Sequence, residues 1–463
     1  MSGATHRHEP LPMSAEPSRF ARRIGIPIRR FMSTEAASGA ILMVAVLAAL
    51  SWANSPWSAG YLALWATPVA ISVGGFAIDK PLVLWVNDGL MAIFFFLVGL
   101  EIKRELLYGE LSSPRAAALP IAAALGGMVT PAGIYLAING FGETSRGWAI
   151  PMATDIALAL GVLALLGRRA PTELRVFLLA FAIVDDLGAI AVIALFFTEA
   201  ISFQALLIGA GLFSLIVLGV RVGMRSPLVY LILAVLFWVA ILKSGIHATI
   251  AGVLLAMVVP ASAAIGPDRF AELVGGLLDR LEKPAGEPSE AIGTVSTLVT
   301  LSEAPLERLE RLLHPWVSYL IVPIFALANA GVVLSGEALA EAATSTITLG
   351  VAAGLLIGKP LGIVGASLLM VRAGLAVLPH HVRWPQVLGV GILGGIGFTV
   401  ALFIGDLAFD LPQQEALAKV GILAASVAAG IAGYLVLRLT TPPATTNSAT
   451  SVSHGARERR PKH

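Results

Sequence analysis

The sequence contains no cysteine, which excludes disulfides and thiolate chemistry. Charged residues are also scarce, at 13%, about half their share in a typical soluble protein. The net charge is only +2, which leaves no basic excess for binding nucleic acid. By contrast, hydrophobic residues make up 57% of the chain, and the mean hydropathy is +0.85. Most of the surface must therefore meet the lipid bilayer, and the sequence predicts an all-α integral membrane protein.

Apolar runs follow one another along most of the chain, and a helix needs about 20 apolar residues to cross the hydrocarbon. On this criterion the sequence predicts twelve transmembrane spans. They lie at residues 36–54, 83–102, 115–138, 147–166, 174–197, 203–220, 227–242, 247–260, 315–334, 346–371, 384–405 and 414–437.

The distribution of positive charge supports these spans. Nearly all of the 31 Lys and Arg residues fall on one side of the predicted membrane. Positive charge marks the cytoplasmic side, so both termini are expected to be cytoplasmic. The exceptions are Lys80, Arg146, Lys243 and Lys419 on the opposite side, and Lys359 within a span.

The segments outside the spans suggest a simple division of the chain. Residues 1–34 form a predicted cytoplasmic tail, 35–438 the twelve-helix domain, and 439–463 a disordered cytoplasmic tail. Residues 67–80, TPVAISVGGFAIDK, alternate around two glycines and predict a β-hairpin on the outer side, or otherwise an irregular loop. The cytoplasmic loop 261–313 contains leucines at helical spacing near its end, which predict a short interfacial helix.

Four ionisable residues lie inside predicted spans, where each costs about 2.5–3.5 kcal/mol on insertion scales. Asp185 and Asp186 occur in LLAFAIVDDLGAIAVIALFF, Lys359 in LGVAAGLLIGKPLGIVGASLL and Asp155 in WAIPMATDIALALG. An ion pair that only pins helices together explains Lys359 and one aspartate but leaves the second aspartate unexplained. Adjacent carboxylates at mid-membrane titrate as a coupled pair and can exchange protons for a cation.

Irregular backbone is predicted at the same depth. Pro151 and the pair Thr154-Asp155 interrupt one span, and the run Gly394-Gly395-Ile396-Gly397 interrupts another. Breaks of this kind are tolerated in a membrane only where they line a cavity or are buried in protein. A hard monovalent cation prefers oxygen ligands, which Asp185, Asp186 and Thr154 supply.

A second acidic pattern occurs at the cytoplasmic end of the second span, in GLEIKRELLYGEL. Glu101 and Glu105 are four residues apart on one helix face, where like charges repel and acids oppose the helix dipole. The pattern fits an ordinary solvated helix end and, equally, a titrating cluster that senses cytoplasmic pH.

Several stretches together closely resemble the NhaA family of sodium/proton antiporters, over about residues 35–438. They are WVNDGLMAIFFFLVGLEIKRELLYGEL, ATDIALALGVLALLG, AIVDDLGAIAVIALFFT, ILKSGIHATIAGV, HPWVSYLIVPIFALANAGV, GLLIGKPLGI and GILGGIGFTVALFI. The resemblance implies inverted repeats with two broken, crossing helices, an architecture for which this family is itself an established example. It also implies electrogenic, pH-regulated exchange of sodium (or lithium) for protons in a bacterial cytoplasmic (inner) membrane.

The resemblance further implies a role for each site residue. Asp185 and Asp186, with Thr154, would bind sodium and carry protons; Asp155 and Lys359 would compensate charge at the helix crossing, with Lys359 paired to Asp185. Glu101 and Glu105 would sense pH, and the outer hairpin would join two protomers. The broken-helix glycines are Gly394, Gly395 and Gly397. One departure is Asp406, where a small residue is more usual; it adds a charge near the outer mouth.

The sequence gives less support to other functions. A sodium-coupled symporter of a small solute is the main alternative, and it would need a roomier cavity. An intramembrane aspartyl protease needs Tyr-Asp and Gly-x-Gly-Asp motifs, which this sequence lacks. A channel is disfavoured because Lys359 beside the aspartates favours occlusion. We therefore expect a transporter, not an enzyme, with no cofactor beyond the transported ions.

Overall fold

The computed structural model describes residues 35–441, except Gly75, Glu199, Arg225, Ala264, 282–293, Ser296 and Thr300. The predicted tail at 1–34 lies outside the described residues. So does most of the predicted C-terminal tail, because the last helix continues to Thr440, two residues beyond the predicted domain boundary.

The chain is almost entirely helical, in agreement with the predicted class. The first half contains α2 (Glu35–Ala53), α3 (Ser58–Ala66), α4 (Leu82–Trp85), η2 (Val86–Leu90), α5 (Met91–Tyr108), η3 (Glu110–Ser112), α6 (Pro114–Asn139), η4 (Glu143–Met152), α7 (Ile156–Ala164), η5 (Gly167–Arg169), α8 (Thr172–Phe196), α9 (Phe203–Arg221), α10 (Pro227–Lys243) and α11 (Thr249–Val258). The second half contains α12 (Pro267–Leu281), α14 (Pro305–Trp316), η6 (Val317–Ile321), α15 (Val322–Asn329), α16 (Gly336–Thr344), α17 (Thr346–Ala353), η7 (Gly354–Gly358), α18 (Lys359–Arg372), α19 (Trp384–Leu393), α20 (Phe398–Ala408) and α21 (Pro412–Thr440).

Each predicted span coincides with apolar helix. Among the described residues, eight helices are long and apolar enough to cross a membrane, or up to ten if each of two bent pairs counts as one span. The predicted spans 227–242 and 247–260 correspond to α10 and α11, which are apolar but shorter. In α11 the ten helical residues reach only about 15 Å, so it crosses the hydrocarbon only in part.

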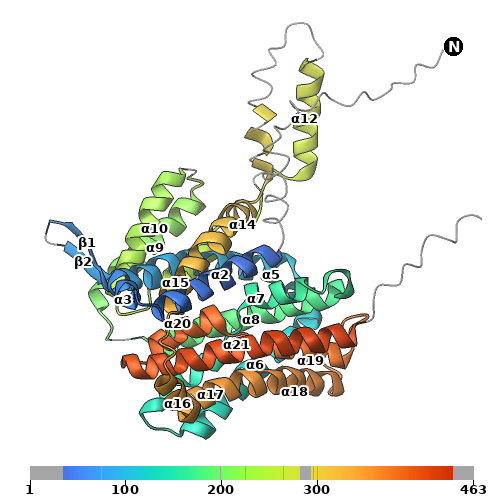
Figure 1. Ribbon diagram of the computed structural model, residues 1–463. Helices are drawn as coiled ribbons and strands as arrows, with labels where there is room; N and C mark the ends of the chain where they lie inside the picture. Colours follow the sequence, from blue (N-terminus) through green and yellow to red (C-terminus); the bar gives the residue numbers. More distant parts are fainter. Residues whose placement is uncertain are drawn as a thin grey trace, which may run out of the picture.

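The predicted hairpin is confirmed. Strands β1 (Pro68–Val73) and β2 (Phe76–Pro81) pair antiparallel, with Val69 opposite Lys80 and Ile71 opposite Ile78. Gly74 in the turn has a φ of +60°, which glycine adopts without strain. The hairpin projects from one end of the bundle (Figure 1), which we call the hairpin end. The opposite end, where α21 finishes, is the tail end.

Two spans are broken at mid-length, as the sequence predicted. The 3-10 helix η4 ends at Met152, and α7 begins only at Ile156. Similarly, α19 ends at Leu393 and α20 begins at Phe398, with a bend of 47° between them. Each broken span lies between two long helices in the chain: η4–α7 between α6 and α8, and α19–α20 between α18 and α21. The two halves of the chain therefore present the same kind of interruption.

Close packing of α6 against α18 sets the position of Lys359, the first residue of α18. A Cβ at Gly126 would lie 2.2 Å from the carbonyl oxygen of Gly362, so only glycine permits this approach. The turn before Lys359, η7, is a π-helix, a form common at functional sites.

The predicted cytoplasmic loop is partly helical. The leucine pattern near its end forms α14, whose Leu306 is fully buried, so the helix there is confirmed. Earlier in the loop, α12 stands well away from the bundle in Figure 1. The bundle's core runs beneath these elements, between α5, α6, α8, α20 and α21.

Candidate ion-binding site

The two broken spans meet at their breaks. The backbone amide of Asp155 donates a hydrogen bond to the carbonyl of Ile396 at 2.6 Å. The hydroxyl of Thr154 donates to the carbonyl of Gly394 at 2.9 Å. Both side chains are buried. The predicted crossing is therefore present, and these bonds satisfy backbone groups that the breaks leave unpaired.

Asp155 joins the starts of the two helices that leave this crossing. One carboxylate oxygen accepts from the amide of Leu158 at 2.9 Å and so caps α7. The other accepts from the amide of Thr399 at 3.1 Å and from its hydroxyl at 2.6 Å, in the first turn of α20. Helix N-termini carry partial positive charge, and a single carboxylate here offsets two of them. Sequence reasoning missed Thr399, although a polar residue two positions after the glycine run was a usable signal.

Asp185 and Lys359 form the predicted ion pair. The Lys359 ammonium lies 2.8 Å from Oδ1 and 2.7 Å from Oδ2 of Asp185, and both side chains are 0% exposed. The backbone amide of Thr154 also interacts with the Asp185 carboxylate. The Lys359 ammonium lies 5.7 Å from the ring centroid of Phe181 as well. This pair links α8 and α18 directly beside the crossing.

Asp186 differs from its neighbour because, within the described residues, it forms no ion pair. Its side chain is buried, and its Oδ1 has no hydrogen-bond partner among the described residues. It interacts electrostatically with Asp185, Asp155 and Glu101, all of which are acids, and with Lys359. An uncompensated buried oxygen is costly unless a proton or a cation joins it.

The glycines at the second break allow its close approach to the surrounding backbone. A Cβ at Gly395 would lie 2.5 Å from the carbonyl oxygen of Leu355. At Gly394 a Cβ would lie 2.8 Å from the side chain of Ile363, and at Gly397 it would lie 3.2 Å from the carbonyl of Ala153. Larger residues at Gly394 or Gly395 would therefore displace the crossing.

The chemistry of the site suits a hard, weakly held cation. Within the described residues, no group of three or more His, Cys, Asp or Glu side chains is arranged to hold a metal ion. What the structure brings together is Asp155, Asp185, Asp186, Thr154 and Lys359. Among these, Asp185, Asp186 and Thr154 carry carboxylate and hydroxyl oxygens of the kind that a monovalent cation prefers.

Glu101 and Glu105 lie apart from the crossing, toward the tail end of α5. Arg104 between them forms an ion pair with Glu310 of α14 and lies 3.6 Å from Glu105. Glu101 interacts electrostatically with Glu105, Arg104 and Glu310. The sequence revealed the two glutamates but not their link to Glu310, since that residue follows in the chain by some two hundred positions.

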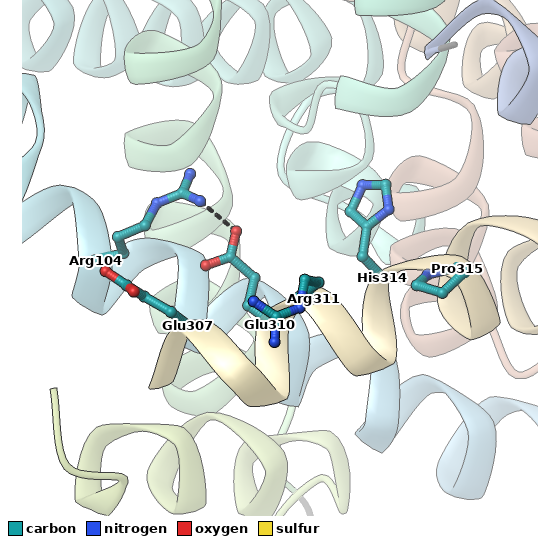
Figure 2. A pocket seen from close by; sticks show the side chains of 6 residues that line it. All are labelled: Arg104, Glu307, Glu310, Arg311, His314 and Pro315. Atoms are coloured by element: carbon teal, nitrogen blue, oxygen red, sulfur yellow. Dashed lines mark hydrogen bonds and ion pairs between the residues drawn. The ribbon is translucent and has the colours of Figure 1, made fainter. Parts of the chain in front are cut away.

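A shallow cleft of about 410 Å³ opens at this junction. Figure 2 shows Arg104 reaching from α5 to Glu310 on α14, with further α14 side chains along the same wall. The lining residues are Arg104, Glu307, Glu310, Arg311, His314 and Pro315. Titratable groups from two spans therefore meet in a cleft at the tail end.

Buried carboxylates at the crossing of two broken membrane spans define a secondary transporter of cations. The family model for Na+/H+ antiporter 1 matches residues 29–437. The chain is 50% identical to the Na(+)/H(+) antiporter NhaA of Oleidesulfovibrio alaskensis, over 89% of this chain and 94% of the relative. It is 48% identical to Na(+)/H(+) antiporter NhaA 2 of Sorangium cellulosum, over 92% of both. The chain therefore belongs to the Na+/H+ antiporter 1 family, and sodium/proton antiport is the activity that membership assigns to it.

Proposed function

We propose that this chain exchanges sodium, or lithium, for protons electrogenically, with Asp185, Asp186 and Thr154 as the ion ligands. The observation that carries the proposal is the buried, unpartnered Oδ1 of Asp186 beside the Asp185–Lys359 pair. A proton or a sodium ion relieves the same uncompensated charge, so the two compete for one site. Competition of this kind is what an exchanger requires.

The ion pair supplies the charge imbalance. A sodium ion that binds between Asp185 and Asp186 displaces the proton on Asp186 and competes with Lys359 for Asp185. Lys359, released from its partner in a site without bulk water, gives up its own proton. Two protons then leave for each sodium ion that enters, and one net charge moves per cycle.

Asp155 and Lys359 compensate charge at the crossing in this proposal. Asp155 offsets the positive starts of α7 and α20, which would otherwise repel an entering cation. Its hydrogen bonds to Leu158 and Thr399 support this role. Asp155 therefore keeps the site neutral enough for sodium without being a ligand itself.

Regulation by pH belongs to the cluster around Glu101 and Glu105. Protonating either glutamate changes the balance that Arg104 and Glu310 hold between α5 and α14. Because the charge of Glu101 acts electrostatically on Asp186, a shift of the α5 end changes the electric field at the ion site. This is a local charge change acting on a movable element.

The proposal also covers the location of the protein and its assembly. The bias of Lys and Arg toward one side supports cytoplasmic termini in a bacterial inner membrane. The exposed strands β1 and β2 offer unpaired edges that support a homodimer through the hairpin. No cofactor is needed, because the cycle uses only sodium and protons.

The test is exchange by the purified full chain in proteoliposomes. Adding sodium or lithium should collapse an imposed pH gradient, potassium should not, and the exchange should generate a membrane potential. The symporter alternative predicts that collapse depends on a co-transported solute. Sodium addition that leaves the pH gradient intact, across the range pH 6–9 in roughly unit steps, would overturn the proposal.

A further inference from the structure

Asp406 is a half-buried carboxylate that the exchange site does not use. It lies on α20 near the hairpin end, and its Oδ2 accepts a hydrogen bond from the side-chain amide of Asn87 at 2.7 Å. Asn87 belongs to η2, a π-helical turn at the start of the α5 span. Interruptions of that kind often accompany function.

A buried pair of amides holds this partner of Asp406 in place. Asn329, at the end of α15, donates to the Asn87 oxygen at 2.8 Å, and Asn87 donates back at 3.2 Å. Asn329 also donates to the carbonyl of Phe325 at 3.0 Å. Since Asn87 and Asn329 are both buried, the amide aimed at Asp406 is fixed by contacts from another span.

The charges around Asp406 do not neutralise it. On η2, Asp88 is paired with Lys80 at 2.6 Å, and on α21, Glu415 is paired with Lys419. On η4, Arg146 is paired with Asp410, and α15 contributes the neutral Asn329. Asp406 itself forms no ion pair among the described residues. The named pairs around it therefore sum to zero, and the Asp406 carboxylate is the one surplus negative charge, which a proton removes.

Asp406 is aligned with the crossing along α20. It follows Thr399, the partner of Asp155, by seven residues, which places both on one helix face about 10 Å apart. Between them, the Phe403 ring packs 5.7 Å from Phe95 and 6.3 Å from Phe325. A polar layer at the hairpin end is thus separated from the crossing by one layer of rings.

We infer that Asp406 is a further proton-accepting residue of the exchange cycle, receiving protons from the medium at the hairpin end. This inference rests on the proposed function. A proton from water binds the Asp406 carboxylate. It passes to the crossing carboxylates, as sodium leaves them, when the Phe403 ring layer parts, and it is then released at the tail end. A sodium ion is disfavoured at Asp406, because the Asn87 oxygen is already occupied by Asn329.

The test separates the pH dependence of the two ends of the protein. Vesicles carrying the full chain are loaded with radioactive sodium, and efflux is measured while the pH of one side varies and the other is clamped. The absence of native cysteine allows orientation to be checked with a Ser72→Cys reporter on β1 and an impermeant maleimide. Wild-type exchange should fall at alkaline pH on the hairpin side, as protons become scarce.

The variants Asp406→Asn and Asp406→Ser both remove the proton-accepting group, and the first keeps an acceptor for Asn87. In both, the alkaline limb on the hairpin side should move to lower pH. Efflux at the alkaline end should fall about a hundredfold, the low end of what a positioned proton-transfer group contributes. Asp406→Glu should keep the limb near its wild-type position. The matched control is Asp410→Asn, an exposed carboxylate four residues further on, which should behave as wild type.

The inference is overturned if the alkaline limb of the hairpin-side pH profile is unchanged in both Asp406→Asn and Asp406→Ser. It is also overturned by an equal loss of rate at every hairpin-side pH, or by an equal shift of the tail-side profile, because either indicates a structural role only. A wild-type protein without sodium exchange would instead overturn the proposed function, so the two failures are distinct.

Discussion

Two ion pairs, one at the crossing and one at the tail end, use similar chemistry in opposite surroundings. Lys359 and Asp185 are both 0% exposed and lie between helices that contact the broken spans. Arg104 and Glu310 are 34% and 14% exposed and line an open cleft. Each pair joins two spans, and each has a further acid beside it.

The difference in burial separates their roles. A buried pair gains little stability over apolar residues, because desolvation offsets most of the attraction. Stability therefore does not account for its presence at mid-membrane, and the pair fits the ion exchange proposed above. The Arg104–Glu310 pair is partly exposed, so solvent screens it and it breaks and re-forms more easily than the fully buried pair. That property suits a pair that responds to the surrounding medium.

The largest effect is expected from removing a carboxylate at the crossing, which tests whether the buried charges there bind the transported ions. Asp186→Asn and Asp185→Asn should each abolish sodium-dependent proton movement, because amidation keeps the shape but removes the charge and the titrating proton. Both variants should fold, but Asp185→Asn leaves the Lys359 ammonium unpaired and should lower Tm more than Asp186→Asn does. Proton flux in proteoliposomes and a melting curve measure the two effects. Asp410→Asn is the control at an exposed carboxylate, and wild-type exchange in both crossing variants would refute the ion-site assignment.

Breaking the buried pair should affect stability as well. Lys359→Ala leaves Asp185 as an uncompensated buried charge, which costs about 3–5 kcal/mol. If Asp185 takes up a proton, the loss is smaller and electroneutral exchange survives, so membrane potential and Tm are measured together. Arg146→Ala, which breaks an exposed pair with Asp410, should change Tm little. An unchanged Tm with unchanged electrogenic exchange would exclude Lys359 from the cycle.

A smaller effect is expected at Thr399. Thr399→Val removes the hydroxyl that donates to Asp155 but leaves the backbone amide in place. A hydrogen bond to a charged group contributes about 1.5–3 kcal/mol, so Tm and exchange rate should both fall. Thr399→Ser restores the hydroxyl and should recover both. If the Ser and Val variants behave alike, the hydroxyl does not brace the crossing.

The smallest effect is expected at the tail end, where Glu101 and Glu105 should alter only the pH dependence of exchange. Acid should slow exchange in two ways: protons compete with sodium at Asp185 and Asp186, and protonation of Glu101 or Glu105 alters the α5 end. Excess sodium overcomes only the first. Glu101→Gln combined with Glu105→Gln should therefore shift the pH profile at saturating sodium while preserving the competition at low sodium. A profile identical to wild type at saturating sodium would leave both glutamates as a solvated helix end.

Much of this arrangement could be predicted from single segments of the sequence. The hairpin was apparent from alternation around Gly74, and the breaks from Thr154-Asp155 and the glycine run. Both depend on local backbone preference, which neighbouring residues determine. The family resemblance then supplied the pairing of Lys359 with Asp185, which the structure confirms.

Contacts between distant segments were not predictable in the same way. Thr399, Glu310 and the Asn87–Asn329 pair acquire their partners only through packing of spans far apart in the chain. Each residue taken alone is an ordinary polar residue in or near a helix. Hydrophobic pattern reports which residues face lipid, but it does not report which helix lies opposite.

The hydrogen bonds of Asp155 also bear on how the protein changes shape. The Asp155 carboxylate accepts hydrogen bonds from the first turns of both α7 and α20. Separating these helices would break these bonds together, and each contributes about 1.5–3 kcal/mol. Any change of shape that keeps these bonds must therefore move the starts of α7 and α20 together.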